Sequence, residues 1–80
     1  MNNKEVLEQL TLIFHKVFND EDIIMSMDLT SDDIDGWSSI SQMLMVAEIE
    51  KSFDIKFKLI DIATMNSVAD IVNHIQAKLK

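Results

Sequence analysis

The sequence contains no cysteine and a single glycine, Gly36. The lack of cysteine excludes disulfide bonds and thiolate metal sites, and it leaves the redox compartment open. One glycine is too few for the glycine-rich fingerprint of dinucleotide-binding folds or for a phosphate-binding P-loop. No apolar run approaches membrane-spanning length, and the first ten residues lack the basic start and apolar middle of a signal peptide. We therefore expect a soluble, cytoplasmic protein that does not insert into a membrane.

Histidine is also scarce, since the chain has only His15 and His74. Neither lies in an HExxH motif or at metal-ligand spacing, so we expect both to be surface residues. Nothing in the sequence points to a Ser-His-Asp arrangement. We predict that the protein is not an enzyme and has neither catalytic residues nor a metal site.

Length and composition set the size of the core. The chain has 80 residues, of which 48% are apolar. This is enough for one small hydrophobic core and argues against disorder. We predict a single domain spanning residues 1–80.

The net charge of −7 is unevenly distributed along the chain. All seven basic residues are lysines, and none lies between Lys16 and Lys51. Nine acidic residues fall between these two lysines: Asp20, Glu21, Asp22, Asp28, Asp32, Asp33, Asp35, Glu48 and Glu50. Such a surface would repel nucleic acid and attract basic partners, which argues against a nucleic-acid-binding helical domain. The simpler alternative is a solvated acidic loop that keeps a small protein soluble.

Apolar spacing predicts an amphipathic helix over residues 3–18, followed by a long loop over residues 19–37. The core face of the helix would comprise Val6, Leu10, Ile13, Phe14 and Val17. Connections as long as the loop are uncommon in compact domains and are often functional. We expect the apolar side chains of the loop to hold it against the core: Ile23, Ile24, Met27, Leu29 and Ile34.

A second helix is predicted from Ser39 to about Ser52, with two apolar stripes. One stripe is about 100° wide and typical of a core face: Met45, Val46, Ile49 and Phe53. The other lies on roughly the opposite side: Ile40, Met43, Leu44 and Ala47. The second stripe is either covered by the long loop or left open for a partner.

The last third of the sequence predicts an extended connection, a short helical turn and a final helix. Apolar residues alternate from Phe53 to Leu59, and the turn is expected at residues 59–63. Ser67 and Asp70 have capping-box spacing before an apolar helical stripe, and Lys78 and Lys80 suit a helix C-terminus. The fold class is therefore all-α, a small bundle of three main helices and one short helix.

The serines that open the second helix have two interpretations. Ser38 is a good N-cap, and Ser39 would lie exposed in the first turn. A phosphate ester on Ser39 would gain about 0.3–1 kcal/mol from the helix dipole. The local pattern is equally consistent with a cap and solvent-facing serines.

The whole chain resembles an acyl carrier protein, in which a serine opens the second of four helices after a long acidic loop. The family's signature there is Asp-Ser-Leu, preceded in one large branch by Gly-Trp, and this chain has Gly36-Trp37-Ser38-Ser39-Ile40. The segment "VAEIEKSFDIKF" also resembles the family's passage from the second helix to the third. The resemblance implies that Ser39 carries covalent 4′-phosphopantetheine, that Trp37 anchors the end of the loop, and that Gly36 permits a tight approach.

Two residues depart from the family's pattern. Ser38 stands where the family has an aspartate that helps the modifying transferase and its metal to find the serine. Leu44 stands where these carriers usually have a polar or acidic residue, which suggests a dedicated partner.

The resemblance further implies a carrier of acyl or aminoacyl thioesters in fatty acid, polyketide or peptide biosynthesis. Its partners would be a phosphopantetheinyl transferase and acyl- or aminoacyl-loading and acyl-using enzymes with basic docking patches, and it would act as a monomer. The expected docking residues are Asp35, Ser38, Ile40, Met43, Leu44, Ala47 and Glu48. The alternative is an interaction module that keeps the carrier fold but is no longer phosphopantetheinylated.

Overall fold

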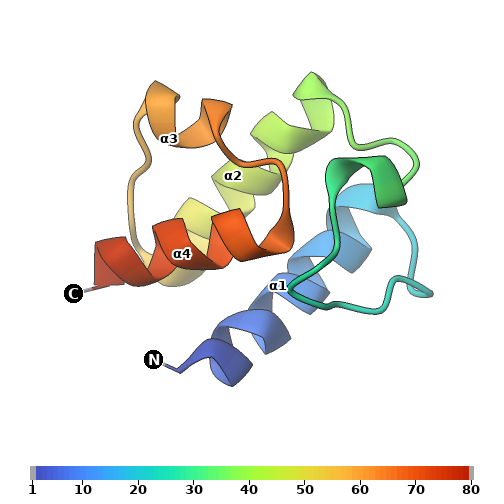
Figure 1. Cartoon of the computed structure of the whole chain (residues 1–80), viewed down its shortest axis with the longest axis horizontal. Helices are drawn as coiled ribbons and strands as arrows, with labels where there is room; N and C mark the ends of the chain where they lie inside the picture. The colour runs from blue at the N-terminus through green and yellow to red at the C-terminus, as the bar shows by residue number, and fades with distance from the viewer. Residues whose placement is uncertain (1, 80) are drawn as a thin grey trace.

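The computed structural model describes residues 2–79 and is built of helices (Figure 1). The elements in chain order are α1 (Asn3–Phe18), the 3₁₀ turn η1 (Ser31–Asp33), α2 (Ser39–Phe53), α3 (Leu59–Ala63) and α4 (Val68–Leu79). Between residues 2 and 79 the only β-type pairing is an isolated bridge between Thr30 and Ser67. The all-α prediction and the predicted helices are confirmed, although Lys80, expected at the last helix end, lies outside the described residues.

The core lies where α1, α2 and α4 meet. Its buried side chains are Val6, Leu10, Ile13 and Phe14 from α1, Met45, Val46, Ile49 and Phe53 from α2, and Val68, Ile71, Val72 and Ile75 from α4. Each large aliphatic side chain removed from water contributes about 1.5–3 kcal/mol before conformational entropy is subtracted. The first stripe of α2 is therefore a core face, as predicted. Val17 is partly buried against the same core.

Polar caps fix the ends of the two longest helices. Asn2 accepts a hydrogen bond from the Glu5 amide at 2.8 Å, and the Glu5 carboxylate accepts one from the Asn2 amide at 3.1 Å. At the C-termini, Asn19 and Asp54 adopt left-handed conformations with φ of 50° and 55°. Short polar side chains tolerate this region better than other non-glycine residues, so both helices end without glycine.

The loop between α1 and α2 lies at the opposite end of the molecule from the termini (Figure 1). Ile34 is buried, while Ile23, Met27 and Leu29 pack partly against the core, as predicted. The prediction for Ile24 is wrong, because its side chain is 85% exposed. Partly buried and exposed side chains alternate from Ile23 to Met27, so Met25 rather than Ile24 contacts the core.

Two sets of hydrogen bonds tie this loop to the helices. His15 Nε2 donates to the Ile23 carbonyl over 3.0 Å. At the other end of the loop, the Val68 amide donates to the Leu29 carbonyl over 2.8 Å, and the Ser31 amide donates to the Asn66 carbonyl over 3.1 Å. His15 is thus half-buried and structural, which corrects its prediction as a surface residue.

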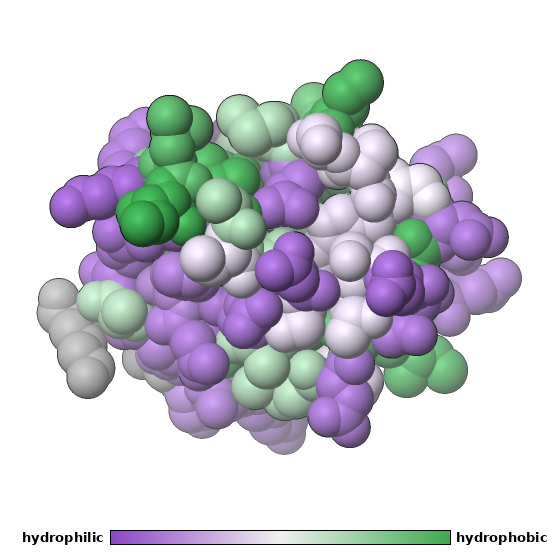
Figure 2. All heavy atoms as spheres, turned by 45° about the horizontal axis from the view of Figure 1, so that its top comes forward, coloured by the Kyte–Doolittle hydropathy of each residue, from purple (hydrophilic) through white to green (hydrophobic). Residues whose placement is uncertain are grey.

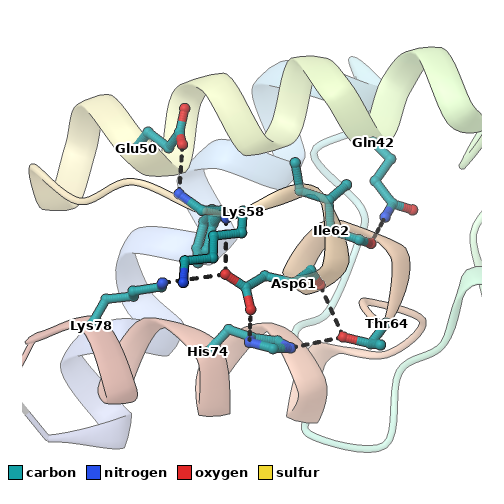
Figure 3. A network of polar contacts seen from close by, with 9 residues as sticks. Gln42, Glu50, Lys58, Asp61, Ile62, Thr64, His74 and Lys78 are labelled. Carbon is teal, nitrogen blue, oxygen red and sulfur yellow. Dashed lines mark hydrogen bonds and ion pairs between the residues drawn. The ribbon is translucent and has the colours of Figure 1, made fainter.

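Helix α3 has no buried residue and is held largely by polar contacts (Figure 3). Asp61 accepts hydrogen bonds from the Lys58 amide at 2.9 Å and from Lys78 Nζ at 3.2 Å, and His74 Nδ1 lies 3.7 Å from its other oxygen. The Lys58 amide, followed by Lys78 and His74, lowers the pKa of Asp61 despite the opposing effect of burial. His74 Nε2 also lies 2.9 Å from the Thr64 hydroxyl. His74 is therefore half-buried in this network, not the surface residue that the sequence suggested.

Candidate attachment site and docking face

The three serines at the start of α2 occupy different environments. Ser38 is the N-cap, with extended φ and ψ of −114° and 179°, and its hydroxyl accepts the Ser41 amide at 3.3 Å. This confirms the predicted cap. Ser39 is the first residue of α2, and its side chain is exposed. Its hydroxyl has no hydrogen bond to any group in residues 2–79, so it is the serine at this site that is free to react.

Ser41 organises the turn that precedes the helix. It is only 9% exposed, and its hydroxyl donates to the Gly36 carbonyl at 2.6 Å while accepting the Ser38 amide at 2.7 Å. Ser38 and Ser41 thus form a reciprocal capping box. This role was not predicted, because the usual capping-box signature has glutamate or glutamine three residues after the cap. A serine three residues after the cap was the available signal.

Trp37 anchors the end of the loop. Its ring packs edge-on against Phe14, with centroids 5.6 Å apart, and at a tilt against Phe18, with centroids 6.0 Å apart. Its Nε1 donates to Gln42 Oε1 at 3.1 Å, and Gln42 Nε2 donates to the Ile62 carbonyl at 2.6 Å. The predicted anchoring role is confirmed. No feature of the sequence predicts that Gln42 joins the loop end to α3.

Gly36 is required for its backbone conformation. Its φ is +86°, which is costly for residues with a side chain. A Cβ added at this position would have no heavy atom within 4 Å. The expected tight approach is therefore wrong, and the left-handed turn explains the glycine.

The second stripe of α2 is open. Ile40, Met43 and Leu44 are 76%, 53% and 56% exposed, and Ala47 is also exposed. The long loop does not cover these residues, so the alternative in which the loop buries the second stripe is excluded. Figure 2 shows apolar surface over α3 and towards the start of α2, set among hydrophilic residues. Leu59 and Ile60 of α3 are exposed as well.

Two hollows border this face. One, of about 320 Å³, lies beside the free serine between α2 and α3, and is lined by Ser39, Gln42, Met43, Ile62, Ala63 and Asn66. The other, of about 230 Å³, lies between α1 and α2, and is lined by Lys16, Val17, Leu44, Ala47 and Glu48. The open stripe is therefore hollowed on both sides.

Similarity to a solved structure identifies the family. The chain superposes on the NMR structure of a holo acyl carrier protein from Geobacter metallireducens with a TM-score of 0.84 and 34% sequence identity. The match covers 91% of this chain and 84% of the other. The chain belongs to the acyl carrier protein family. No protein-family model and no curated protein sequence matches it significantly.

Membership of this family makes the protein a carrier and not an enzyme, as the sequence predicted. Within residues 2–79, no group of three His, Asp or Glu side chains could hold a metal ion. No helix in the same range is long and apolar enough to cross a membrane.

The charged residues expected to dock partners of this acyl carrier protein differ in their contacts. Asp35 is exposed beside the turn at Gly36. Glu48 accepts a hydrogen bond from Lys16 at 3.1 Å, so its charge is partly neutralised within the molecule. Glu50, which is not one of the expected docking residues, has a structural role. Its carboxylate accepts a hydrogen bond from the Phe57 amide at 2.8 Å (Figure 3). Among residues 2–79, Glu48 therefore has an ion pair, whereas Asp35 has none.

Proposed function

We propose that this acyl carrier protein bears 4′-phosphopantetheine on the Ser39 hydroxyl and carries acyl or aminoacyl groups as thioesters between enzymes. The observation that carries the proposal is the state of Ser39, which is exposed, free of hydrogen bonds to the described residues and located at the start of a 15-residue helix. The similar Geobacter protein was solved as a holo acyl carrier protein, which supports the proposal.

The residues around Ser39 fit such a group. The first amides of α2 and the helix dipole favour a phosphodiester near the helix N-terminus. The hollow beside Ser39 has polar lining from Gln42 and Asn66 and apolar lining from Met43 and Ile62, which suits an arm of mixed polarity. The arm supplies the thiol that this cysteine-free chain lacks.

The open face of α2 is the proposed docking surface. Its apolar strip consists of Ile40, Met43, Leu44 and Ala47. Glu48 lines the hollow beside Leu44 and Ala47, and Asp35 is exposed in the acidic loop that leads to α2. A partner with an apolar contact surrounded by lysine and arginine fits this layout. Its charge would raise the association rate, and the apolar strip would lengthen the lifetime of the complex. The proposed partners are a phosphopantetheinyl transferase and acyl- or aminoacyl-handling enzymes.

In this proposal, residues 1–80 act as one carrier domain, as a monomer and in the cytoplasm. The alternative is a carrier-fold interaction module without the arm, and Ser38 in place of the family's aspartate is the feature that favours it.

Intact-mass measurement after co-expression with a phosphopantetheinyl transferase separates these functions. The wild-type chain should gain the mass of one phosphopantetheine group, and Ser39→Ala should not. The Ser39→Ala variant should keep its helical circular dichroism spectrum, because an exposed first-turn residue contributes little packing. A wild-type chain that stays unmodified with transferases of broad specificity would favour the interaction module.

A further inference from the structure

Ser41 is not an exposed serine and cannot be an attachment point in this fold, yet it makes the largest number of polar contacts at the site. Its hydroxyl bonds to Gly36 at 2.6 Å and to the Ser38 amide at 2.7 Å. Both partners belong to the turn that immediately precedes Ser39. One buried side chain thus holds that turn at two points.

The turn needs this support, because its conformation is not intrinsically favoured. Gly36 has a φ of +86° and open space around its Cα, so no neighbouring side chain restricts it sterically. Glycine has the largest conformational freedom to lose on ordering. Trp37 fixes the next residue by packing on α1, but among residues 2–79 only Ser41 bonds the backbone on both sides of Trp37.

We propose that Ser41 is a positioning residue for the modification of Ser39, acting through the Gly36–Ser38 turn. This inference rests on the proposed function. Without the Ser41 hydroxyl, the Gly36 carbonyl and the Ser38 amide turn to water, and the segment beside Ser39 must be ordered at each encounter with the transferase. That ordering cost reduces the population of chains competent to bind. A chain that has bound should react as before.

The test is transferase kinetics on the full chain. Ser41→Ala should raise the KM for the carrier about three- to tenfold, the effect of losing about one hydrogen bond, and change kcat less than about twofold. Glu5→Ala is the matched control, because the Glu5 side chain accepts the N-cap amide of α1 as the Ser41 side chain accepts that of α2. It should destabilise the fold similarly and leave KM unchanged. All rates are measured where circular dichroism shows every variant folded.

Amide hydrogen exchange supplies an independent readout of the turn. The Ser38 amide should exchange faster in Ser41→Ala, while amides in the middle of α2 keep their protection. Ser41→Thr retains the hydroxyl and should restore both slow exchange at Ser38 and the wild-type KM. Slow exchange at Ser38 with a KM still raised would overturn the proposal.

The outcomes distinguish this inference from the proposed function. If wild-type labelling is normal and Ser41→Ala labels with the same KM, the positioning role is wrong and the carrier function stands. An equal rise in KM for Glu5→Ala would also overturn the role, because lost stability would then be the cause. If the wild-type chain is never labelled, the proposed function fails and the inference fails with it.

Discussion

At the residue scale, the start of α2 assigns one task to each of its serines. Ser38 caps, Ser41 holds the turn, and Ser39 faces solvent with its hydroxyl unbonded. Without the Ser38 hydroxyl the Ser41 amide would lose its acceptor, and without the Ser41 hydroxyl the Ser38 amide would lose its own. The third serine is thereby left as the chemically available one. Local capping geometry therefore selects the candidate attachment point.

Ser38 is the residue at which this site differs from the family's signature. Ser38→Asp should speed modification of Ser39, because aspartate keeps the cap and adds a negative charge that helix N-termini favour. The measurement is the initial rate of labelling by one transferase at equal carrier concentration. Ser38→Asn caps without charge and should label more slowly than Ser38→Asp. Equal or slower labelling of Ser38→Asp than of wild type would show that the transferase does not use this charge.

The cap itself also has a measurable effect. Ser38→Ala should lower the free energy of unfolding by about 1 kcal/mol, because the Ser41 amide loses its acceptor. Urea denaturation followed by circular dichroism measures this difference. An unchanged urea midpoint would mean that water replaces the Ser38 hydroxyl at the Ser41 amide without loss of stability.

At the element scale, α2 has a core face and an open face, and two consecutive residues, Leu44 and Met45, belong to opposite faces. Met45 is completely buried and Leu44 is 56% exposed. Leu44→Glu should weaken acyl transfer to or from the cognate enzyme and leave the domain folded. Met45→Glu should unfold it, because a charge would enter the core without a partner at a cost of several kcal/mol or more, roughly the whole stability of a small domain.

Thermal unfolding by circular dichroism and an acyl-transfer assay measure the two variants side by side. Cooperative unfolding of Leu44→Glu near the wild-type temperature is the expected result. If Leu44→Glu unfolds as badly as Met45→Glu, Leu44 contributes to the core and the docking face lies elsewhere.

Much of the arrangement of elements could be predicted from spacing, because each helix has an amphipathic period or a cap. The bounds of α1 and α3 agree with the expected ranges. Ile24 was assigned wrongly because hydrophobicity alone does not specify which side of an extended segment faces the core. Ser41 and Gln42 were missed for a related reason. Their partners, Gly36 and Ile62, become neighbours only once the loop and α3 have packed on α2.

At the scale of the whole molecule, a polar network joins α3 to α4, and Ile62 is the side chain of α3 that packs partly against the core. Asp61 is central to the network, and its pKa is lowered by the Lys58 amide, then by Lys78 and His74. A carboxylate with a lowered pKa in the folded state contributes stability above its unfolded pKa. That contribution disappears as the pH falls through the folded value.

The consequence is an acid-dependent loss of stability that Asp61→Asn should reduce. As the pH falls through the ordinary carboxyl range and below it, the wild-type unfolding midpoint should fall more steeply than that of Asp61→Asn. Urea titrations at several pH values measure both. Asp54→Asn is a suitable control, because Asp54 is exposed at a helix end. Parallel curves for wild type and Asp61→Asn would contradict the stabilising role of this ionised carboxylate.

The central claim is that one serine, Ser39, bears the arm that makes this molecule a carrier. Peptide mapping of the labelled wild-type chain by fragmentation mass spectrometry tests it most directly. Phosphopantetheine on Ser39, with Ser38 and Ser41 unmodified, is the predicted result. Location of the group on either of those two neighbours, or on any other residue, would contradict the account.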